Sequence, residues 1–301
     1  MEFLYLLESI RNPILDGLML LITTFGEETA FLAAAIITFW CVDKNRGYYL
    51  MAVGFSGTVL NQILKLLCRI PRPWVRDPNF TIVEAAREAA DGYSFPSGHS
   101  QSAVGTFGGL AATGKNKVLR WIFLAIAILV PVSRMYLGVH TPADVLVGSG
   151  CAVLLIFAFR FVNDGKYVPH VLFGLLGFSV VFVLFVEFFP FPADIDQHNY
   201  ASGLKNAYTL FGCILAMVIV YFVDKKWVNF PVKAIWWAQI LKVAIGLGLV
   251  LAVKSGLKTP LNLLLGTSWG TFARYFLIVI VAGILWPLSF KWFSKLGKKA
   301  K

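Results

Sequence analysis

The chain has 301 residues, of which 58% are hydrophobic and only 14% are charged, and its mean hydropathy is +0.72. Soluble domains average about 45–50% apolar and about 25% charged residues, so this composition excludes a soluble globular domain, a disordered chain and a soluble nucleic-acid binder. The net charge is +11. In a membrane protein, such an excess of Lys and Arg usually lies in the cytoplasmic loops. We therefore expect an all-α, polytopic membrane helical bundle with no nucleic-acid partner.

Hydrophobic segments predict about nine transmembrane helices joined by short connections, because a hydrocarbon core of about 30 Å needs about 20 helical residues. The segments run over residues 27–42, 47–67, 98–113, 117–137, 141–162, 169–189, 203–223, 233–254 and 271–292.

The N-terminal residues 1–26 contain apolar stretches that are interrupted by Arg11, Pro13 and Asp16. This pattern predicts interfacial helices. The alternative is a tenth crossing within residues 13–25, which would place the N-terminus on the other side of the membrane.

The distribution of Lys and Arg predicts the orientation. The loops on one side carry 15 of these residues and those on the other side carry 11, with Lys242 in the middle of a predicted span. The positive-inside rule places the richer side, which includes the C-terminus, in the cytoplasm.

Three polar clusters interrupt the hydrophobic sequence, and all three fall on the predicted outer side. They are Lys65 with Arg72-Pro73, then Pro96-Ser97-Gly98-His99, then Ser133-Arg134 with His140 and Asp144. Helices that alternate in direction bring the three clusters to one membrane face.

The residue types in these clusters suit a phosphate group. Lys65, Arg72 and Arg134 can clamp its oxygens by charge-assisted hydrogen bonds. Ser97 and Gly98 stand where a helix begins, and its unpaired N–H groups favour anions. Each residue also has a structural interpretation: the cations can snorkel at helix ends, and Ser97 can be an N-cap.

The two histidines are candidates for bond making and breaking. His140 and Asp144 are four residues apart, so one helix face can hold both. A carboxylate on one ring nitrogen fixes the tautomer and leaves the other nitrogen free to attack phosphorus. His99 can protonate the leaving oxygen and later activate water. Alternatively, Asp144 completes a capping box with Thr141.

The ordered spacing of the three clusters, over residues 65–144, resembles the signature of the type 2 phosphatidic acid phosphatase superfamily. The resemblance implies a five-helix catalytic core, with His140 as the nucleophile that forms a phosphohistidine, Asp144 as its orienting group and His99 as the general acid. It also implies a reaction without a metal ion or other cofactor. The phosphate ligands that it implies are Lys65, Arg72, Ser97, Gly98 and Arg134.

The resemblance divides the chain into N-terminal interfacial helices over residues 1–26, a catalytic core over 27–165 and a transmembrane extension over 166–301. The layout is similar to that of the glucose-6-phosphatase branch, and sphingosine-phosphate phosphatases also carry additional C-terminal helices. Within the extension we expect Lys242 to face other helices and to find a polar partner.

These observations predict an integral-membrane phosphatase with its site on the outer face, in the plasma membrane of a bacterium. The expected substrate is a lipid phosphate: phosphatidate, phosphatidylglycerophosphate, a prenyl pyrophosphate or a sphingoid phosphate. A soluble phosphate ester is an alternative substrate. A lipid phosphotransferase uses the same residues, and a non-enzymatic carrier of phosphate lipids would need only the cations.

Overall fold

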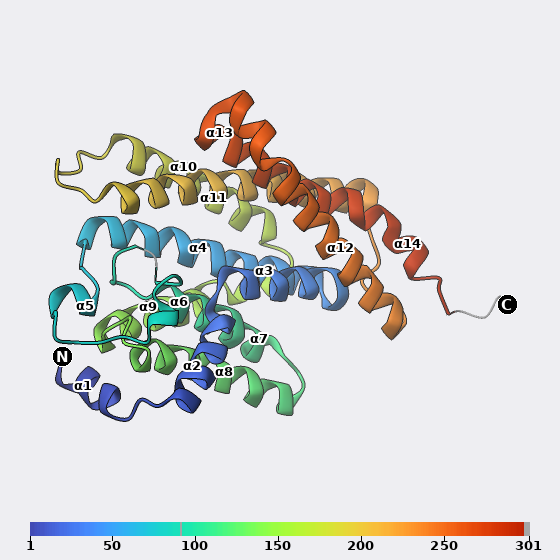
Figure 1. The fold of residues 1–301 in the computed structure, drawn as a ribbon. Helices are drawn as coiled ribbons and strands as arrows, with labels where there is room; N and C mark the ends of the chain where they lie inside the picture. Colours follow the sequence, from blue (N-terminus) through green and yellow to red (C-terminus); the bar gives the residue numbers. More distant parts are fainter. Residues whose placement is uncertain (91, 298–301) are drawn as a thin grey trace. The chain divides into compact units, whose positions relative to one another are not determined.

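The computed structural model describes residues 1–90 and 92–297, and every regular element in these ranges is a helix (Figure 1). The C-terminal residues 298–301, which we predict to be cytoplasmic, lie outside the described residues. The chain forms two compact units. The motif unit comprises Met1–Ala34, Leu50–Arg160 and Phe191–Gly203, and the extension unit comprises Ala35–Tyr49, Phe161–Pro190 and Leu204–Lys301.

Among the described residues, seven helical segments are long and apolar enough to cross a membrane, and the bent pair Pro13–Gly26 and Glu28–Val42 gives up to eight if it is one broken span. The predicted count of nine is therefore not confirmed. The seven segments are Lys44–Arg76, Lys117–Tyr136, Pro142–Asp164, Val168–Phe188, Gln197–Val228, Trp236–Gly256 and Lys258–Phe293.

Two predicted spans account for the difference. Residues 27–42 pass the length and hydropathy test only together with the preceding helix, from which they are bent by 52°. Residues 98–113 are helical, with a π-helical turn over Val104–Gly108, but this segment is shorter than the about 20 residues that a hydrocarbon core of about 30 Å needs.

Besides the start of α11 (Gln197–Val223), the motif unit contains, wholly or in part, nine α-helices among the described residues. They are α1 (Glu2–Ser9), α2 (Pro13–Thr23), α3 (Glu28–Ile37), α4 (Lys44–Cys68), α5 (Pro73–Arg76), α6 (Gly98–Ala103), α7 (Gly109–Thr113), α8 (Lys117–Tyr136) and α9 (Pro142–Ala158).

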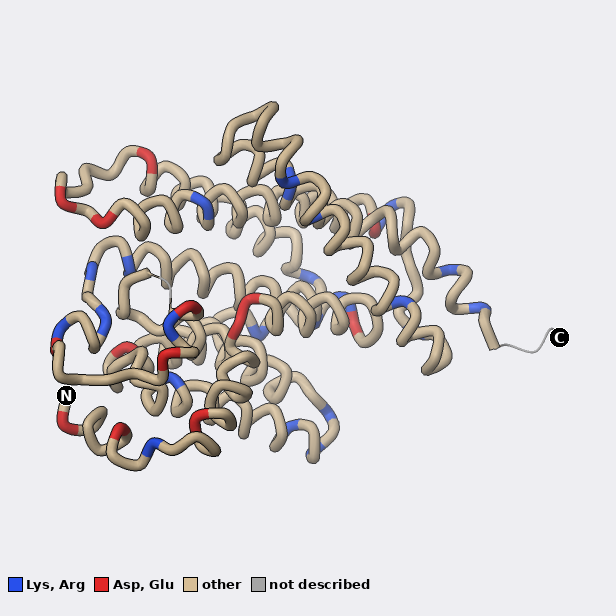
Figure 2. The backbone as a smooth tube through the Cα atoms, viewed as in Figure 1, with Lys and Arg blue, Asp and Glu red and all other residues tan. Residues whose placement is uncertain are grey.

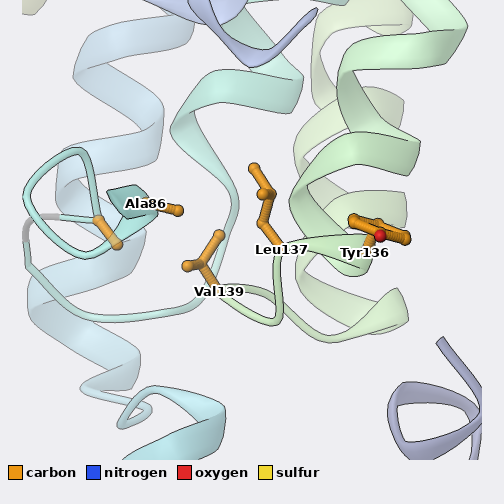
Figure 3. Close-up of a cluster of buried hydrophobic side chains, with 5 residues drawn as sticks. Ala86, Tyr136, Leu137 and Val139 are labelled. Atoms are coloured by element: carbon orange, nitrogen blue, oxygen red, sulfur yellow. The ribbon is translucent and has the colours of Figure 1, made fainter. Parts of the chain in front are cut away.

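The packing of α6 and of the α8–α9 connection determines where the polar clusters lie. Helix α6 packs against α8 and α9. Figure 3 shows a buried apolar cluster that holds the connection between α8 and α9, which precedes His140. The cluster consists of Ala86, Ala90, Tyr136, Leu137 and Val139.

The extension unit holds α10 (Val168–Phe188), α12 (Trp236–Gly256), α13 (Lys258–Ile280), α14 (Phe290–Phe293) and most of α11 (Gln197–Val223). Helix α13 begins 13 residues earlier than the predicted span 271–292, so the expected loop before it is helical from Lys258. The chain bends sharply within it at Gly266, whose φ of 76° is unfavourable for residues with a side chain.

Most charged residues lie near helix ends and in connecting loops, with long uncharged stretches between them (Figure 2). Lys242 is an exception, because it is fully buried in the extension unit. Its Nζ donates to the carbonyl oxygens of Trp40 at 2.9 Å and Val232 at 3.2 Å and lies 4.2 Å from the centre of the Phe290 ring. The expectation that Lys242 finds polar partners is confirmed.

Candidate active site

The first polar cluster lies where α4 ends. Lys65 is in the last turn of α4, and the left-handed conformation of Arg69, with φ of 50°, ends the helix. The chain then turns, so that Arg72 becomes the N-cap residue of the short helix α5. Lys65 and Arg72 are both buried.

Gly92 brings these two cations close together. Its carbonyl oxygen accepts a hydrogen bond from Arg72 Nε at 2.9 Å. A Cβ atom built on Gly92 would lie 3.5 Å from Lys65 Nζ and 3.1 Å from Asn199 Oδ1. The ammonium group therefore lies beside the loop at Gly92, whose φ of 73° favours glycine.

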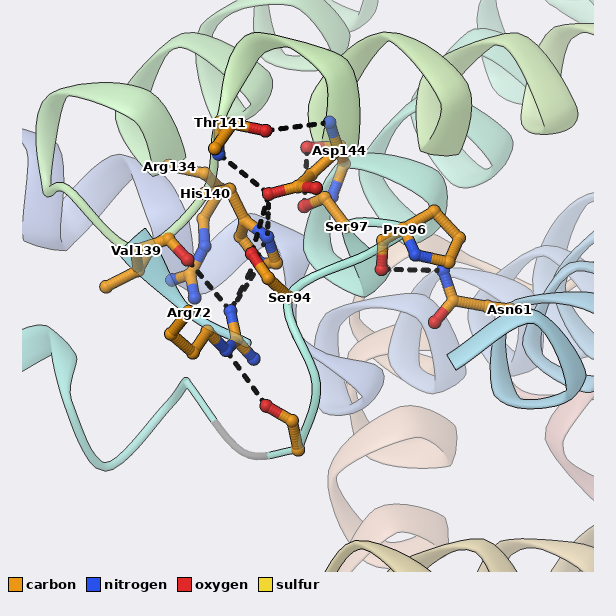
Figure 4. Close-up of polar contacts among 12 residues, drawn as sticks. Asn61, Arg72, Ser94, Pro96, Ser97, Arg134, Val139, His140, Thr141 and Asp144 are labelled. Atoms are coloured by element: carbon orange, nitrogen blue, oxygen red, sulfur yellow. Dashed lines mark hydrogen bonds and ion pairs between the residues drawn. The ribbon is translucent and has the colours of Figure 1, made fainter. Parts of the chain in front are cut away.

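The guanidinium group of Arg72 also contacts the predicted nucleophile (Figure 4). Arg72 Nη1 lies 2.9 Å from His140 Nε2 and donates to the carbonyl oxygen of Val139 at 2.9 Å. A guanidinium only donates hydrogen bonds, so this contact requires a lone pair on Nε2 of His140.

Asp144 approaches the other ring nitrogen of His140. Its Oδ2 lies 3.6 Å from His140 Nδ1 and accepts hydrogen bonds from Ser94 Oγ at 2.6 Å and Thr141 N at 2.7 Å. A carboxylate beside Nδ1 favours a proton there, which leaves Nε2 unprotonated. Arg72 Nη1 also lies 3.4 Å from Nδ1, so the carboxylate of Asp144 is the contact that assigns the proton to Nδ1 and the attacking lone pair to Nε2.

The start of α9 combines the structural and functional interpretations of Asp144. Thr141 is the N-cap, its Oγ1 accepts from Asp144 N at 3.3 Å, and Pro142 occupies the first turn. The predicted capping box is therefore present. The same carboxylate oxygen that closes it faces His140.

The second cluster is attached to the third through its backbone. Ser97 is the N-cap of α6, and its Oγ accepts from Ser100 N at 3.3 Å. Its own N–H donates to the carbonyl oxygen of Asp144 at 2.9 Å. This approach requires Gly148, because a Cβ atom there would lie 2.5 Å from the Ser97 carbonyl oxygen. Gly98, the first residue of α6, follows directly.

Arg134 and His99 each bring a nitrogen that makes no hydrogen bond in the described parts of the chain. Arg134 is fully buried at the end of α8 and donates through Nη1 to Thr23 Oγ1 at 2.9 Å. Its Nε and His99 Nε2 are buried without partners. Buried polar atoms normally have partners, so these nitrogens are suited to accommodate ligand oxygens.

The charge state of His140 follows from its surroundings. Burial, followed by the positive charges of Arg72, Arg134 and Lys65, holds the pKa of His140 well below its usual value. The imidazole is therefore neutral at pH 7, as a nucleophile must be.

Two supporting residues escaped the sequence interpretation. Ser94 donates to Asp144, and Asn61 Nδ2 donates to the carbonyl oxygen of Pro96 at 3.3 Å. Asn61 lies one helical turn before Lys65 on α4, and Ser94 lies three residues before Ser97. Their proximity in sequence to the clusters was a signal, but no spacing rule assigns them partners.

No group of three or more His, Cys, Asp or Glu side chains suits a metal ion within residues 1–90 and 92–297. In the acidic turn after α10, Asp196 is engaged in a local hydrogen bond, since its Oδ1 accepts from Asn199 N at 2.8 Å.

Comparison with known proteins gives two matches to family models. The PAP2 superfamily, the type 2 phosphatidic acid phosphatases, matches residues 45–167, and the transmembrane extension of PAP2 superfamily phosphatases matches residues 208–299. Phosphatidylglycerophosphatase B of Bacillus subtilis is 30% identical over 161 residues, which are 49% of this chain and 75% of that protein. The chain belongs to the PAP2 superfamily. The predicted resemblance is confirmed.

Other PAP2 phosphatases are also similar to the chain. The undecaprenyl-diphosphatase BcrC of Bacillus subtilis is 29% identical over 52% of this chain and 79% of its own length. The crystal structure of a transmembrane PAP2-type phosphatidylglycerolphosphate phosphatase from Bacillus subtilis has 28% identity, covers 54% of this chain and 83% of that chain, and gives a TM-score of 0.46. The two curated Bacillus subtilis relatives are phosphatases by name, which together with the family match supports phosphatase activity.

Proposed function

We propose that the protein hydrolyses a phosphate monoester or pyrophosphate of a lipid through a phosphohistidine at His140. The observation that carries this proposal is the placement of His140 between Asp144, 3.6 Å from Nδ1, and Arg72, 2.9 Å from Nε2. A site that only bound phosphate would need the cations but not an oriented, neutral imidazole.

In the first step, Nε2 of His140 attacks phosphorus and a P–N bond forms. The bond between phosphorus and the leaving oxygen breaks, and His99 gives that oxygen a proton. Lys65, Arg72 and Arg134 stabilise the negative charge on the phosphoryl oxygens as the transition state forms. The N–H groups at the start of α6, beside Ser97 and Gly98, add to this stabilisation.

In the second step, His99 removes a proton from water, and the oxygen attacks the phosphorylated His140. The P–N bond breaks, inorganic phosphate leaves and the neutral imidazole returns. Asp144 stabilises the positive charge that the ring carries while it is phosphorylated. All groups in this scheme come from the chain, so we expect activity in the presence of a chelator.

A lipid is the substrate class that fits best, for two reasons. The site is built at helix ends, with Lys65 at the end of α4, Arg134 at the end of α8 and His99 at the start of α6. A head group can enter there while its acyl or prenyl chains stay in the bilayer. The Bacillus subtilis relatives are named for undecaprenyl diphosphate and phosphatidylglycerophosphate. The excess of Lys and Arg on the opposite side supports an outer-face site in the plasma membrane of a bacterium.

The test is phosphate release by the purified chain from a panel of substrates with chelator present. The panel comprises phosphatidate, phosphatidylglycerophosphate, a prenyl pyrophosphate, a sphingoid phosphate and glucose 6-phosphate. We expect release from at least one of the lipids, and we expect His140→Ala to lower kcat by at least about 10³-fold. His170→Ala, at an exposed histidine of the extension, is the matched control and should retain activity.

Three results would contradict the proposal. Binding of the lipids without release would identify a carrier. Transfer of phosphate to an added alcohol in preference to water would identify a phosphotransferase. Full activity in His140→Ala would remove the phosphohistidine, whereas acid-labile labelled phosphate on the wild-type chain, absent from His140→Ala, would support it.

A further inference from the structure

Arg274 is a buried arginine of the extension unit that takes no part in the reaction described above. It lies in α13, within a membrane-spanning segment, and is only 5% exposed. It shares a buried stripe of that helix with Gly270, Thr271 and Ile278. The 3–4 residue spacing of this stripe faces Arg274 toward protein and away from lipid chains.

The guanidinium group of Arg274 has neither a hydrogen bond nor an ion pair with any other described residue, and its Nε is a buried atom without a partner. Its Cζ lies 5.1 Å from the ring centre of the neighbouring Tyr275. Three acids of the same unit have other partners: Asp224 pairs with Lys44, Glu187 accepts from Tyr208, and Asp43 accepts from Arg46 N.

A charge in this environment needs an anionic partner. The free-energy cost of burying a guanidinium in a membrane protein is offset only by a counter-charge or strong acceptors. The planar group has donors spaced for two oxygens of one phosphate. Since no carboxylate of residues 1–90 and 92–297 forms an ion pair with Arg274, a phosphate-bearing ligand matches the chemistry.

A second polar group lies on the same face of α13. The chain folds back at Gly266, so a Cβ atom on Gly270 would lie 2.5 Å from Asn262 Oδ1. This oxygen is also buried without a hydrogen-bond partner among the described residues. Gly270 is one helical turn before Arg274, which places the Asn262 amide beside the face that carries the guanidinium. Oδ1 is an acceptor, so the amide has to rotate by 180°, which exchanges its oxygen and nitrogen, to present its two N–H donors to an anion.

We propose that Arg274 and Asn262 form a phosphate-binding site in the transmembrane extension, occupied by the headgroup phosphate of a phospholipid. The exposed lysines that flank the preceding helix turn, Lys254 and Lys258, favour the anionic head groups of a lipid surface. The site requires no hydrolysis and goes beyond the catalytic function proposed above. Free phosphate has the same chemistry, and the experiment separates the two sources.

The first experiment compares melting temperatures of the delipidated full chain in neutral detergent, with and without added phosphatidylglycerol. We expect Arg274→Gln to melt at or above the wild-type temperature without lipid, because the variant no longer buries an unpaired charge. Added phosphatidylglycerol should raise the melting temperature of the wild type and raise that of Arg274→Gln less. A variant that melts lower without lipid and gains as much from lipid would overturn the proposal, since Arg274 would then be structural.

The second experiment locates the ligand. A phosphatidylglycerol analogue with a diazirine near its head group is photolysed with the full chain, and cross-links are mapped to residues 258–280. We expect Arg274→Gln to lower the yield at least about fivefold, with partial recovery in Arg274→Lys, which keeps the charge. Lys291→Gln removes an exposed charge of α14, in the same unit but outside the proposed site, and should change the yield less than about twofold.

Competition identifies the source of the phosphate. Unlabelled phosphatidylglycerol should suppress the cross-link, whereas diacylglycerol, which lacks phosphate, should not. Suppression by inorganic phosphate alone would assign the site to free phosphate. Equal suppression by diacylglycerol, or an unchanged yield in Arg274→Gln, would refute a phosphate site. The readout depends on position and not on turnover, so it can succeed or fail independently of the phosphatase assay.

Discussion

Both units of the molecule bury positive charge within a membrane-spanning bundle, but they do so in different ways. In the motif unit Arg72 and Arg134 are buried near the predicted nucleophile. In the extension unit Lys242 is fully buried, yet two backbone carbonyls and an aromatic ring surround its Nζ. Burial alone therefore does not distinguish a binding cation from a structural one. The list of partners does, and by that criterion Arg134 and Arg274 each keep a nitrogen available, whereas Lys242 is occupied.

Among substitutions of buried cations in the two units, the largest loss of activity should come from removing one of the predicted phosphate-binding cations of the motif unit. Arg72→Gln should lower kcat/KM by about 10²-fold or more, because the variant loses charge stabilisation of the phosphoryl oxygens and the donor beside His140 Nε2. Steady-state phosphate release from the best substrate of the panel measures this loss. The matched control is Arg69→Gln, which removes a neighbouring, partly exposed arginine. Equal losses in the two variants would show that only general positive charge matters.

The pH dependence should link the same arginine to the nucleophile. The pKa of His140 is lowered first by burial and then by the charge of Arg72, so the neutral, attacking form persists to acidic pH. The profile of kcat/KM should be bell-shaped, since His99 must be protonated in the first step. The pKa of His99 is also lowered, by burial and then by Arg134, Lys65 and Arg72, so Arg72→Gln should move both limbs of the profile to higher pH. A profile that is flat from pH 5 to 9 would contradict a mechanism with two histidines.

A smaller loss of activity is expected when the hydrogen bond from Ser94 to the Asp144 carboxylate is removed. Ser94→Ala removes the hydrogen bond to Asp144 Oδ2 and should lower kcat by about tenfold with little change in KM. The matched control is Ser179→Ala, which removes a buried hydroxyl that bonds within its own helix. If Ser94→Ala raises KM and leaves kcat unchanged, Ser94 contacts the substrate and does not position Asp144.

Lys242 provides the opposite test. Lys242→Met should leave kcat unchanged and lower stability by about 1–3 kcal/mol, because the carbonyls of Trp40 and Val232 lose their donor. Thermal melting together with phosphate release measures both quantities, and Lys254→Met at an exposed position is the control. Loss of activity without loss of stability would assign Lys242 to the chemistry and remove the contrast between the units.

Much of the candidate site could be predicted because its residues fall into three short clusters. The N-cap role of Ser97 and the capping box at Thr141 both follow from local chemistry, and both are present. Contacts between segments that are distant in the sequence could not be predicted from these local rules. Nothing in sequence spacing pairs Arg134 with Thr23 or Ser94 with Asp144, since these bonds depend on how helices pack.

The helices show the same division between local and long-range information. Hydrophobic length located the long spans, but the 52° bend after Gly26 and the bend at Gly266 changed what the segments become. Apolar residues on both sides of a turn or bend look continuous in a hydropathy profile. The helix over Lys258–Leu265 was missed because its composition fits a loop as well as it fits an interfacial helix.

The oxygen Oδ2 of Asp144 closes the first turn of α9 and also lies beside His140. Helix initiation and catalytic competence therefore depend on one atom. If the first turn of α9 opens, the imidazole loses its orienting group at the same moment, even though the bundle stays folded. On warming, activity should therefore disappear with this local opening, before the bundle as a whole melts. A chain in which the first turn of α9 has not yet formed would be inactive, even if its other helices were already assembled.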